Sequence, residues 1–277
     1  MMQGHPTRTR TTRRLAIAAI ATTLGVTLVA GCASPGGSSD AGGATKQGAQ
    51  PVLLVAGATG GTGKEVVRQA VARGWNVRVL VRDEAKARVE FGDKVTYVVG
   101  NVREPATLPA AVKGATYVVS ALGSNTMRDP QNKPEVVDYG GVKSLVDASK
   151  AAGVRHFVLV SSMGATHKEH PLNKMFDNIL VWKLKGEDYL RASGVPYTVV
   201  RPGGLADTPG GQKGLKVVQG DPMNVQGRIP RADVATVCLN ALGRKDAAGR
   251  TFEVISDEAT TTVDWNALFA GLKPDVR

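Results

Sequence analysis

One glycine-rich loop limits the folds that this chain can adopt. The apolar run 52–56 precedes Gly57, Gly60 and Gly63, and a helical pattern begins directly after them. In such a loop the first glycine makes a tight turn, the second lets the backbone approach a pyrophosphate, and the third lets the helix pack on the strand. The start of the helix adds free N–H groups and partial positive charge. We therefore predict a dinucleotide site on this loop.

The end of the next strand indicates which dinucleotide is bound. This strand is expected at 76–81, one helix after the loop, and its first polar residue is Arg82, followed by Asp83. An acidic residue here would bind the ribose 2′-OH of NAD, whereas an arginine suits a 2′-phosphate. We predict NADP(H), with NAD as the alternative if Arg82 is only a solvated charge. A nucleotide-kinase loop is excluded, because it needs Gly at Ala58 and Ser or Thr at Glu65.

The first 31 residues have the composition of a targeting segment. They hold four arginines and no acidic residue, and their apolar stretch leads to Cys32. This pattern resembles a bacterial lipoprotein signal peptide, in which cleavage exposes a cysteine that is then lipidated; the alternative is an uncleaved anchor. The pair Arg13 and Arg14 also resembles a twin-arginine export signal. We expect residues 1–31 to be a signal peptide, and the protein to be exported and anchored to the cell membrane through Cys32.

The rest of the chain divides into a linker and one domain. Residues 32–50 are rich in Gly, Ser and Ala and are predicted to be a flexible tether. Residues 51–277 suffice for one α/β domain with a well-filled core. The net charge is +11, but the basic residues form no runs and aromatic residues make up 5%, so no nucleic-acid partner is expected. Cys238 lies in an apolar helical stretch and is predicted to be a buried structural thiol.

Strand-like and helix-like segments alternate along 51–277. This order predicts a single doubly wound parallel sheet with helices on both faces, a Rossmann fold. The predicted strands are 52–56, 76–81, 95–99, 116–121, 155–161, 195–201 and 251–255. The predicted helices are 62–73, 83–90, 106–112, 134–151, 173–192, 231–242 and 263–271.

Small and polar residues follow several of these strands, where ligands bind in such sheets. They are Asn101 after the third strand, Ala121, Leu122 and Gly123 after the fourth, Ser161 and Ser162 after the fifth, and Pro202 and Gly203 after the sixth. The small residues after the fourth strand would let the middle of a dinucleotide lie on the backbone. Asn101 either contacts the adenine edge or makes a turn. Both alternatives stay open from the sequence.

Seven segments together resemble a known family. They are 57–63, 81–83, 120–123, 152–164, 182–187, 194–205 and 231–235, and the resemblance spans nearly all of 51–277. The chain resembles the atypical short-chain dehydrogenase/reductase family, in its NAD(P)H-binding, NmrA-like and flavin-reductase-like branch. This resemblance implies a Rossmann fold and an NAD(P)-dependent oxidoreductase.

The resemblance also implies roles for individual residues. The residues that would hold the pyrophosphate are Gly57, Thr59, Gly60, Gly61, Thr62 and Gly63. Ser161 or Ser162 would hydrogen-bond a substrate carbonyl, and Pro202 and Gly203 would flank the nicotinamide. Lys183 would bind the nicotinamide ribose and lower the pKa of a neighbouring acid.

The chain departs from the family at the proton donor. Typical members carry a tyrosine one helical turn before the lysine, and it donates a proton as the hydride arrives. Ile179 occupies that position here. A reductase would then need an acceptor that takes its proton from water, such as a flavin or quinone, or another donor. The candidates for such a donor are His167, Asp188 and Tyr189.

Two functions remain open at this point. The first is an NADPH-dependent reductase of an unidentified small acceptor. The second is a non-catalytic NADP(H)-binding redox sensor or scaffold, which the missing tyrosine favours. A sugar-nucleotide epimerase is weaker, because that chemistry commonly uses the same tyrosine. His167 and His170 have a spacing that suits a metal on a helix, but they lie between Gly164 and Pro171 and are predicted to form a loop over the site.

Overall fold

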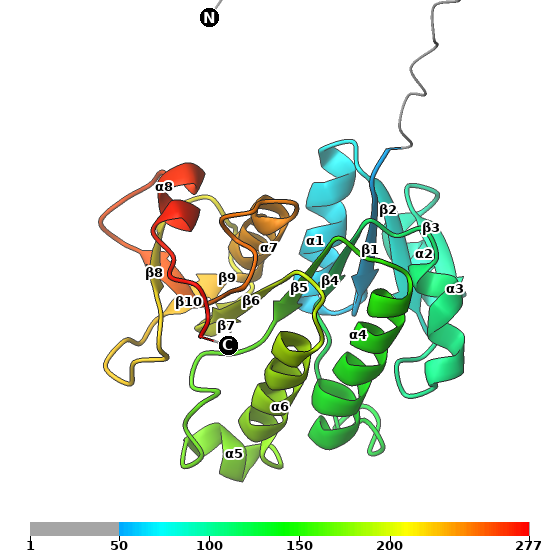
Figure 1. Cartoon of the computed structure of the whole chain (residues 1–277), viewed down its shortest axis with the longest axis horizontal. Coiled ribbons are helices and arrows are strands. Elements are labelled where there is room, and N and C mark those ends of the chain that lie inside the picture. Colours follow the sequence, from blue (N-terminus) through cyan, green and yellow to red (C-terminus); the bar gives the residue numbers. More distant parts are fainter. Residues whose placement is uncertain (1–49, 277) are drawn as a thin grey trace, which may run out of the picture. The chain divides into compact units, whose positions relative to one another are not determined.

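The computed structural model describes residues 50–276 (Figure 1). The predicted signal peptide, its lipidation site Cys32 and nearly all of the predicted tether therefore lie outside the described residues. Within residues 50–276, none of the helices combines the length and the apolar composition needed to cross a bilayer.

A mostly parallel sheet forms the middle layer of residues 50–276, with its eight strands in the order β3-β2-β1-β4-β5-β6-β10-β8. The strands are β1 Val52–Ala56, β2 Asn76–Val81, β3 Thr96–Val99, β4 Tyr117–Ser120, β5 His156–Val160, β6 Tyr197–Pro202, β8 Gly214–Val218 and β10 Arg250–Asp257. Only β8 runs antiparallel to its neighbour within this sheet. A small parallel pair is formed by β7 Gly204–Ala206 and β9 Arg228–Pro230. The predicted doubly wound α/β fold is confirmed.

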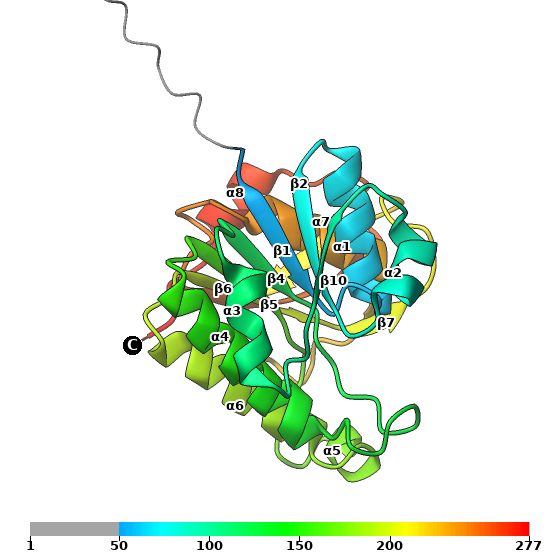
Figure 2. The ribbon, with the colours of Figure 1, turned by 90° about the vertical axis from the view of Figure 1, so that its right-hand side faces the viewer.

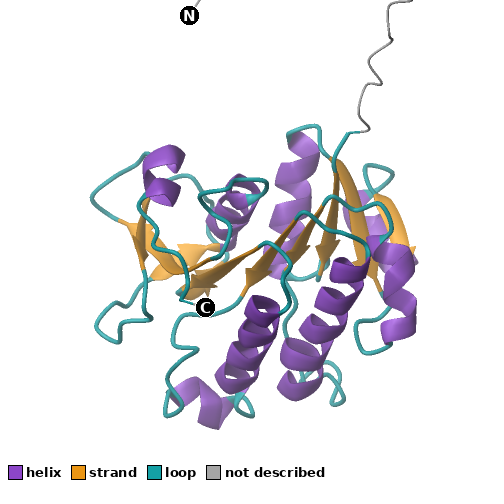
Figure 3. Cartoon of the chain, in the orientation of Figure 1, coloured by secondary structure: helices purple, strands orange, loops and turns teal. Residues whose placement is uncertain are grey.

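Helices cover both faces of the sheet (Figures 2 and 3). The core on one face includes residues of α1, α2, α7 and α8, and the core on the other face those of α3, α4 and α6. The α-helices are α1 Gly61–Ala72, α2 Glu84–Phe91, α3 Leu108–Val112, α4 Val142–Ala151, α5 Pro171–Met175, α6 Ile179–Ala192, α7 Arg231–Ala241 and α8 Trp265–Ala270. A 3-10 turn, η1 Pro105–Thr107, precedes α3, and a π-helical segment, η2 Glu135–Gly141, precedes α4.

Strand β1 shows why a central strand of this sheet can be an unbroken apolar run. Its Leu53 and Val55 belong to one core, while Leu54 and Ala56 belong to the other, and all four are fully buried. Successive side chains of a strand point to opposite faces, so a strand covered on both faces needs apolar residues at every position. Burying one such leucine stabilises the fold by roughly 1.5–3 kcal/mol. Cys238 is fully buried in the first of these cores, as predicted, and burial raises the pKa of its thiol to about 12.

The structure differs from the prediction where the chain leaves this pattern. The helix expected at 173–192 is interrupted between α5 and α6, because Asp177 and Asn178 adopt the left-handed region with φ of 48° and 56°. The side chain of Asn173 accepts a hydrogen bond from the Leu180 N–H at 2.9 Å and joins the two helices. The helix expected at 134–151 begins as the π-helical segment η2. Strands β7, β8 and β9 were not predicted.

Candidate functional site

The glycine loop turns sharply between β1 and α1. Gly57 has a φ of 77°, and its carbonyl accepts a hydrogen bond of 3.0 Å from the Gly60 N–H. A Cβ atom at Gly57 would collide with the main chain at Ala121, and one at Gly63 would collide with the carbonyl of Gly57. Only glycine permits this turn and this close approach of helix to strand. The local geometry expected of the first and third glycines is therefore present.

The start of α1 is open to an anion. Gly60 is its N-cap residue and supplies no side-chain hydrogen bond, and the first turn holds no acidic residue. The N–H groups of a first helical turn have no partner within the helix, so they can be offered to a phosphate. Thr59 is exposed beside them, whereas Thr62 is buried in the helix. The residues present fit a pyrophosphate on the main chain of this loop, and contacts from Thr59 and Thr62 stay predictions.

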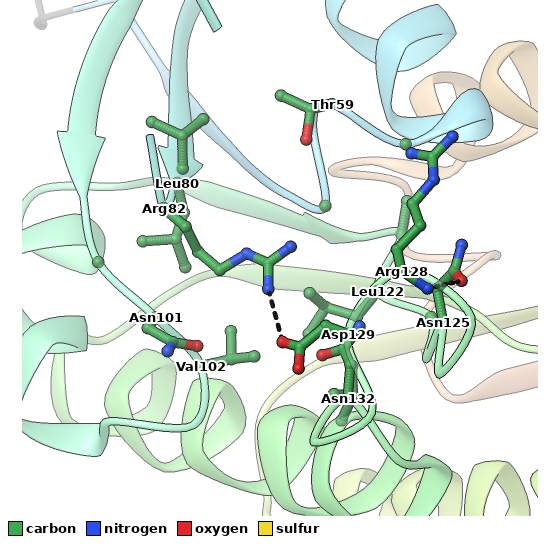
Figure 4. Close-up of a pocket in the computed structure, with 17 residues that line it drawn as sticks. Thr59, Leu80, Arg82, Asn101, Val102, Leu122, Asn125, Arg128, Asp129 and Asn132 are labelled. Atoms are coloured by element: carbon green, nitrogen blue, oxygen red, sulfur yellow. Dashed lines mark hydrogen bonds and ion pairs between the residues drawn. The ribbon is translucent and has the colours of Figure 1, made fainter. Parts of the chain in front are cut away.

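The loops that follow β1, β2, β3 and β4 enclose a cavity, called here the first cavity (Figure 4). Eight residues predicted to bind the cofactor line it: Gly57, Thr59, Gly60, Arg82, Asn101, Ala121, Leu122 and Gly123. They come from loops on both sides of the point where the strand order reverses, between β1 and β4. Ligands bind at such a point in open α/β sheets. The structure thus brings together residues that are up to 66 positions apart in sequence.

An aspartate that the sequence did not single out faces Arg82 across this cavity (Figure 4). The Oδ2 atom of Asp129 lies 3.6 Å from Nη1 of Arg82 and 3.1 Å from Nη1 of Arg103. Asp129 belongs to the loop 121–134 between β4 and η2, which also contributes Arg128 to the lining. The available signal was the length and polarity of this loop directly after a strand, since long loops in compact domains are usually functional.

Asn101 makes a turn. Its side chain accepts a hydrogen bond of 3.1 Å from the Arg103 N–H and donates one of 2.9 Å to Glu104. The sequence left two roles open for Asn101, and these hydrogen bonds correspond to the turn. Asn101 still lines the first cavity, so a contact with an adenine edge remains a prediction.

A second cavity lies beyond the carboxyl ends of β5 and β6. Three predicted site residues line it: Ser162, Pro202 and Gly203. Its apolar lining includes Met163, Leu172, Phe176, Leu205 and Val225. Its charged or titratable lining consists of His167, His170, Asp221 and Arg231. The segment with the two histidines forms turns between β5 and α5, as predicted, and it borders this cavity.

Asp221 holds one wall of the second cavity in place. This residue is buried and has a φ of 54°, and its carboxylate accepts hydrogen bonds from the Gly164 N–H at 2.6 Å and the Thr166 N–H at 2.9 Å. Although burial opposes the charged form, these N–H groups lower the pKa of the Asp221 carboxyl. The Asp221 carbonyl also contacts Nε2 of His167 at 2.7 Å, so that nitrogen carries a hydrogen. At His170, Nδ1 accepts the Leu172 N–H at 3.2 Å.

The other two predicted catalytic residues have buried partners. Ser161 donates a hydrogen bond of 2.5 Å to Glu187, a fully buried carboxylate that also pairs with Arg201 at 2.6 Å. Lys183 lies 2.7 Å from the carboxylate of Asp138, which is also buried. Neither Ser161 nor Lys183 lines the first or second cavity. Their catalytic roles stay predictions, whereas Ser162 has direct access to the second cavity.

Two of the three alternative proton donors are engaged elsewhere. Tyr189 donates a hydrogen bond of 2.5 Å to Asp147 on α4, and Asp188 pairs with Arg191 at 2.7 Å. Neither residue lines the second cavity, while His167 does. The position of the missing tyrosine, Ile179, begins α6.

The sheet and the glycine loop define a dinucleotide-binding protein of the Rossmann class. The model of the NAD(P)H-binding family matches residues 57–245, and the chain belongs to this family. An uncharacterised chloroplastic protein of Arabidopsis thaliana is 40% identical over 251 residues, which cover 78% of this chain and 74% of that protein. Sanguinarine reductase of Eschscholzia californica is 35% identical over 260 residues, which cover 79% of this chain and 94% of that enzyme.

A solved structure supports the same fold. It is described as an NAD-dependent epimerase/dehydratase from Bacillus halodurans, and it matches with a TM-score of 0.68 and 26% identity. The match covers 76% of this chain and 96% of that one. This chain therefore shares its overall fold with that solved structure.

The predicted location is contradicted by the relatives. A second uncharacterised protein of Arabidopsis thaliana and the protein TIC 62 of Pisum sativum are also named as chloroplastic. This finding overturns the prediction of an exported lipoprotein anchored to a cell membrane through Cys32. The prediction rested on an arginine-rich N-terminus without acidic residues and on an apolar stretch that ends at Cys32. Organellar transit peptides share the arginine-rich, acid-poor composition.

Proposed function

We propose that this protein is an NADPH-dependent reductase of a small conjugated acceptor of the flavin or quinone type. One observation carries the proposal: an uncapped helix N-terminus and an arginine at the end of β2 line or border a single cavity at the switch point of the sheet. The pyrophosphate would rest on the main chain of 57–61 and the 2′-phosphate beside Arg82. When bound, NADPH supplies the hydride.

The second cavity supports an apolar, conjugated acceptor. Its lining is largely apolar, and Pro202 and Gly203 border it where the resemblance puts the nicotinamide. Arg231 joins the two regions, because it lines the second cavity and its side chain lies against Gly61 at the start of α1. A dinucleotide that crosses the start of α1 would therefore extend from the first cavity toward the second. The relative from Eschscholzia californica is named as a reductase, which favours the same reaction class here.

The test begins with binding of NADPH and NADH to the purified full-length chain, followed by nucleotide fluorescence. Arg82→Ala should weaken NADPH binding by about tenfold and leave NADH nearly unchanged, since a hydrogen bond to a charged group contributes roughly 1.5–3 kcal/mol. Arg88→Ala is the matched control, because Arg88 is an exposed arginine on α2 whose partners are Glu84 and Asp93 and which does not line the first cavity. Equal weakening of both nucleotides by Arg82→Ala would contradict the NADP preference.

Turnover is then measured with flavin, quinone and carbonyl acceptors, by the loss of near-ultraviolet absorbance as NADPH is oxidised. Turnover with conjugated acceptors and none with simple carbonyls is the expected result, because Ile179 cannot donate a proton. A second candidate function, a non-catalytic redox sensor, is favoured by that same residue. Tight nucleotide binding without turnover on any acceptor would support the sensor instead.

A further inference from the structure

An internal carboxylate competes for the arginine of the first cavity. Asp129 lines this cavity with Arg82, and its Oδ2 atom contacts the guanidinium groups of both Arg82 and Arg103 at 3.6 Å and 3.1 Å. Figure 4 shows the Arg82 and Asp129 side chains pointing toward one another from opposite sides of the cavity. A carboxylate that forms ion pairs with two guanidinium groups occupies a position that also suits the negative charge of a phosphate.

The loop that carries Asp129 is stabilised by its own hydrogen bonds. The Arg128 N–H donates to the Asn125 side chain at 3.1 Å, the Gln131 N–H donates to Asp129 Oδ1 at 3.0 Å, and the Asn132 N–H donates to the Asp129 carbonyl at 2.8 Å. The bonds donated by the Arg128 and Asn132 N–H groups do not involve the Asp129 carboxylate and remain if it moves away from Arg82, whereas the bond from the Gln131 N–H to Oδ1 is broken. Both arginines and Asp129 are partly exposed, with 59%, 23% and 29% of their side chains accessible. Withdrawing the carboxylate therefore disrupts two partly exposed ion pairs, which are weak, and one hydrogen bond from the Gln131 N–H.

We propose that Asp129 sets the preference between NADPH and NADH by competing with the 2′-phosphate for Arg82. The proposal rests on the function proposed above. With NADH, Asp129 stays in place and accepts a hydrogen bond from the ribose 2′-OH, the role that an acidic residue at the end of the second strand has in NAD-binding proteins. With NADPH, the 2′-phosphate takes the place of the carboxylate beside Arg82, because two anions cannot occupy that position together.

The test compares Asp129→Asn and Asp129→Ala with the wild-type full-length chain. Binding of NADPH, NADH, 2′,5′-ADP and 5′-AMP is measured by isothermal titration calorimetry; the last two probes report the phosphate site without the nicotinamide. The matched control is Asp93→Asn, because Asp93 forms an exposed ion pair of 2.8 Å with Arg88 and does not line the first cavity. Thermal melting of each variant confirms that it is folded.

The variants of Asp129 should bind NADPH and 2′,5′-ADP about threefold to fivefold more tightly, since exposed ion pairs contribute up to about 1 kcal/mol. NADH binding should weaken or stay the same, so that the ratio of the two affinities moves toward NADPH. Adding Arg82→Ala should remove most of this gain, and higher salt should reduce it. The control should change neither affinity.

The outcomes separate the two proposals. If the wild type binds both nucleotides and neither variant changes their affinity ratio, or if the variants weaken NADPH binding, the role of Asp129 is refuted and the proposed function stands. If the wild type binds neither nucleotide nor 2′,5′-ADP, the proposed function is refuted, and the role of Asp129 falls with it.

Discussion

A buried histidine should make the fold sensitive to mild acid. His156 on β5 is 2% exposed; its Nδ1 accepts the Gly243 N–H at 3.0 Å, and its Nε2 contacts the Thr198 hydroxyl at 3.0 Å. That hydroxyl donates its own hydrogen to the Ala247 carbonyl at 2.6 Å, so Nε2 of His156 must carry a hydrogen. Both ring nitrogens are thus satisfied in the neutral form. Burial lowers the pKa of His156 from 6.5 to about 4.

The sign and size of the effect follow from linkage. As the pH falls from 6.5 toward 4, the unfolded chain binds a proton at this position and the folded chain does not. The folded state therefore loses stability as the pH falls, and the loss stops growing below the folded pKa. Between about pH 7.5 and about pH 4.5, the shift corresponds to a loss of roughly 2.5 kcal/mol in the free energy of unfolding.

This loss is measured by urea unfolding at these two pH values. The wild type is compared with His156→Asn and His156→Gln. Either variant removes the titrating group, so its free energy of unfolding should fall by roughly 2.5 kcal/mol less than that of the wild type over the same interval. The carboxyl groups titrate in both proteins, and their contribution cancels in the difference. Equal losses in the wild type and in both variants would refute the argument that burial keeps His156 neutral.

Three further changes test the packing around the two cavities. Gly63→Ala should lower the free energy of unfolding by about 1–3 kcal/mol and weaken nucleotide binding. Gly140→Ala is the control and should do neither, because a Cβ atom at Gly140 has more room. Chemical unfolding measures the first effect and nucleotide fluorescence the second. Lys183→Met should cost about 3–5 kcal/mol by leaving the Asp138 carboxylate buried without its cation, and adding Asp138→Asn should restore most of the loss in the same unfolding assay. Asp221→Asn should raise the KM for the acceptor while the Kd for NADPH is unchanged, and a parallel change in both constants would contradict its role in the wall of the second cavity.

Much of the sheet and of the nucleotide site could be predicted because both depend on local sequence. Strands β1 and β2 have the predicted bounds, since β1 is an unbroken apolar run and β2 is apolar except at Asn76 and Arg78, as expected of strands covered on both faces. The glycine loop is equally local: its turn, its helix start and its close packing are made by seven consecutive residues, 57–63. Arg82 could be placed at the cavity because it directly follows a predicted strand.

Contacts between distant segments could not be predicted in this way. Asp129 reaches Arg82 across 47 positions, and Ser161 reaches Glu187 across 26, so no local pattern records either pair. Ser161 and Ser162 follow the same strand and look equivalent in the sequence. Successive side chains of an extended chain point in opposite directions, and here one lies in the buried charge network and the other borders the second cavity. The break before α6 also depends on a side chain, Asn173, that bonds the main chain of the next helix.

The geometry of the two histidines bears on the kind of acceptor that a reductase of this type could use. His167 directs its Nε2 hydrogen to the carbonyl of Asp221, which leaves that hydrogen unavailable to a ligand. His170 accepts the Leu172 N–H at Nδ1, so its hydrogen is on Nε2, and a second hydrogen on Nδ1 would face that N–H group. Through its Nε2 hydrogen, His170 can donate a hydrogen bond to an acceptor oxygen. An acceptor whose reduced form is stabilised by conjugation, and which completes its protonation from water, needs no more than that hydrogen bond, whereas reduction of a simple carbonyl needs a proton at once.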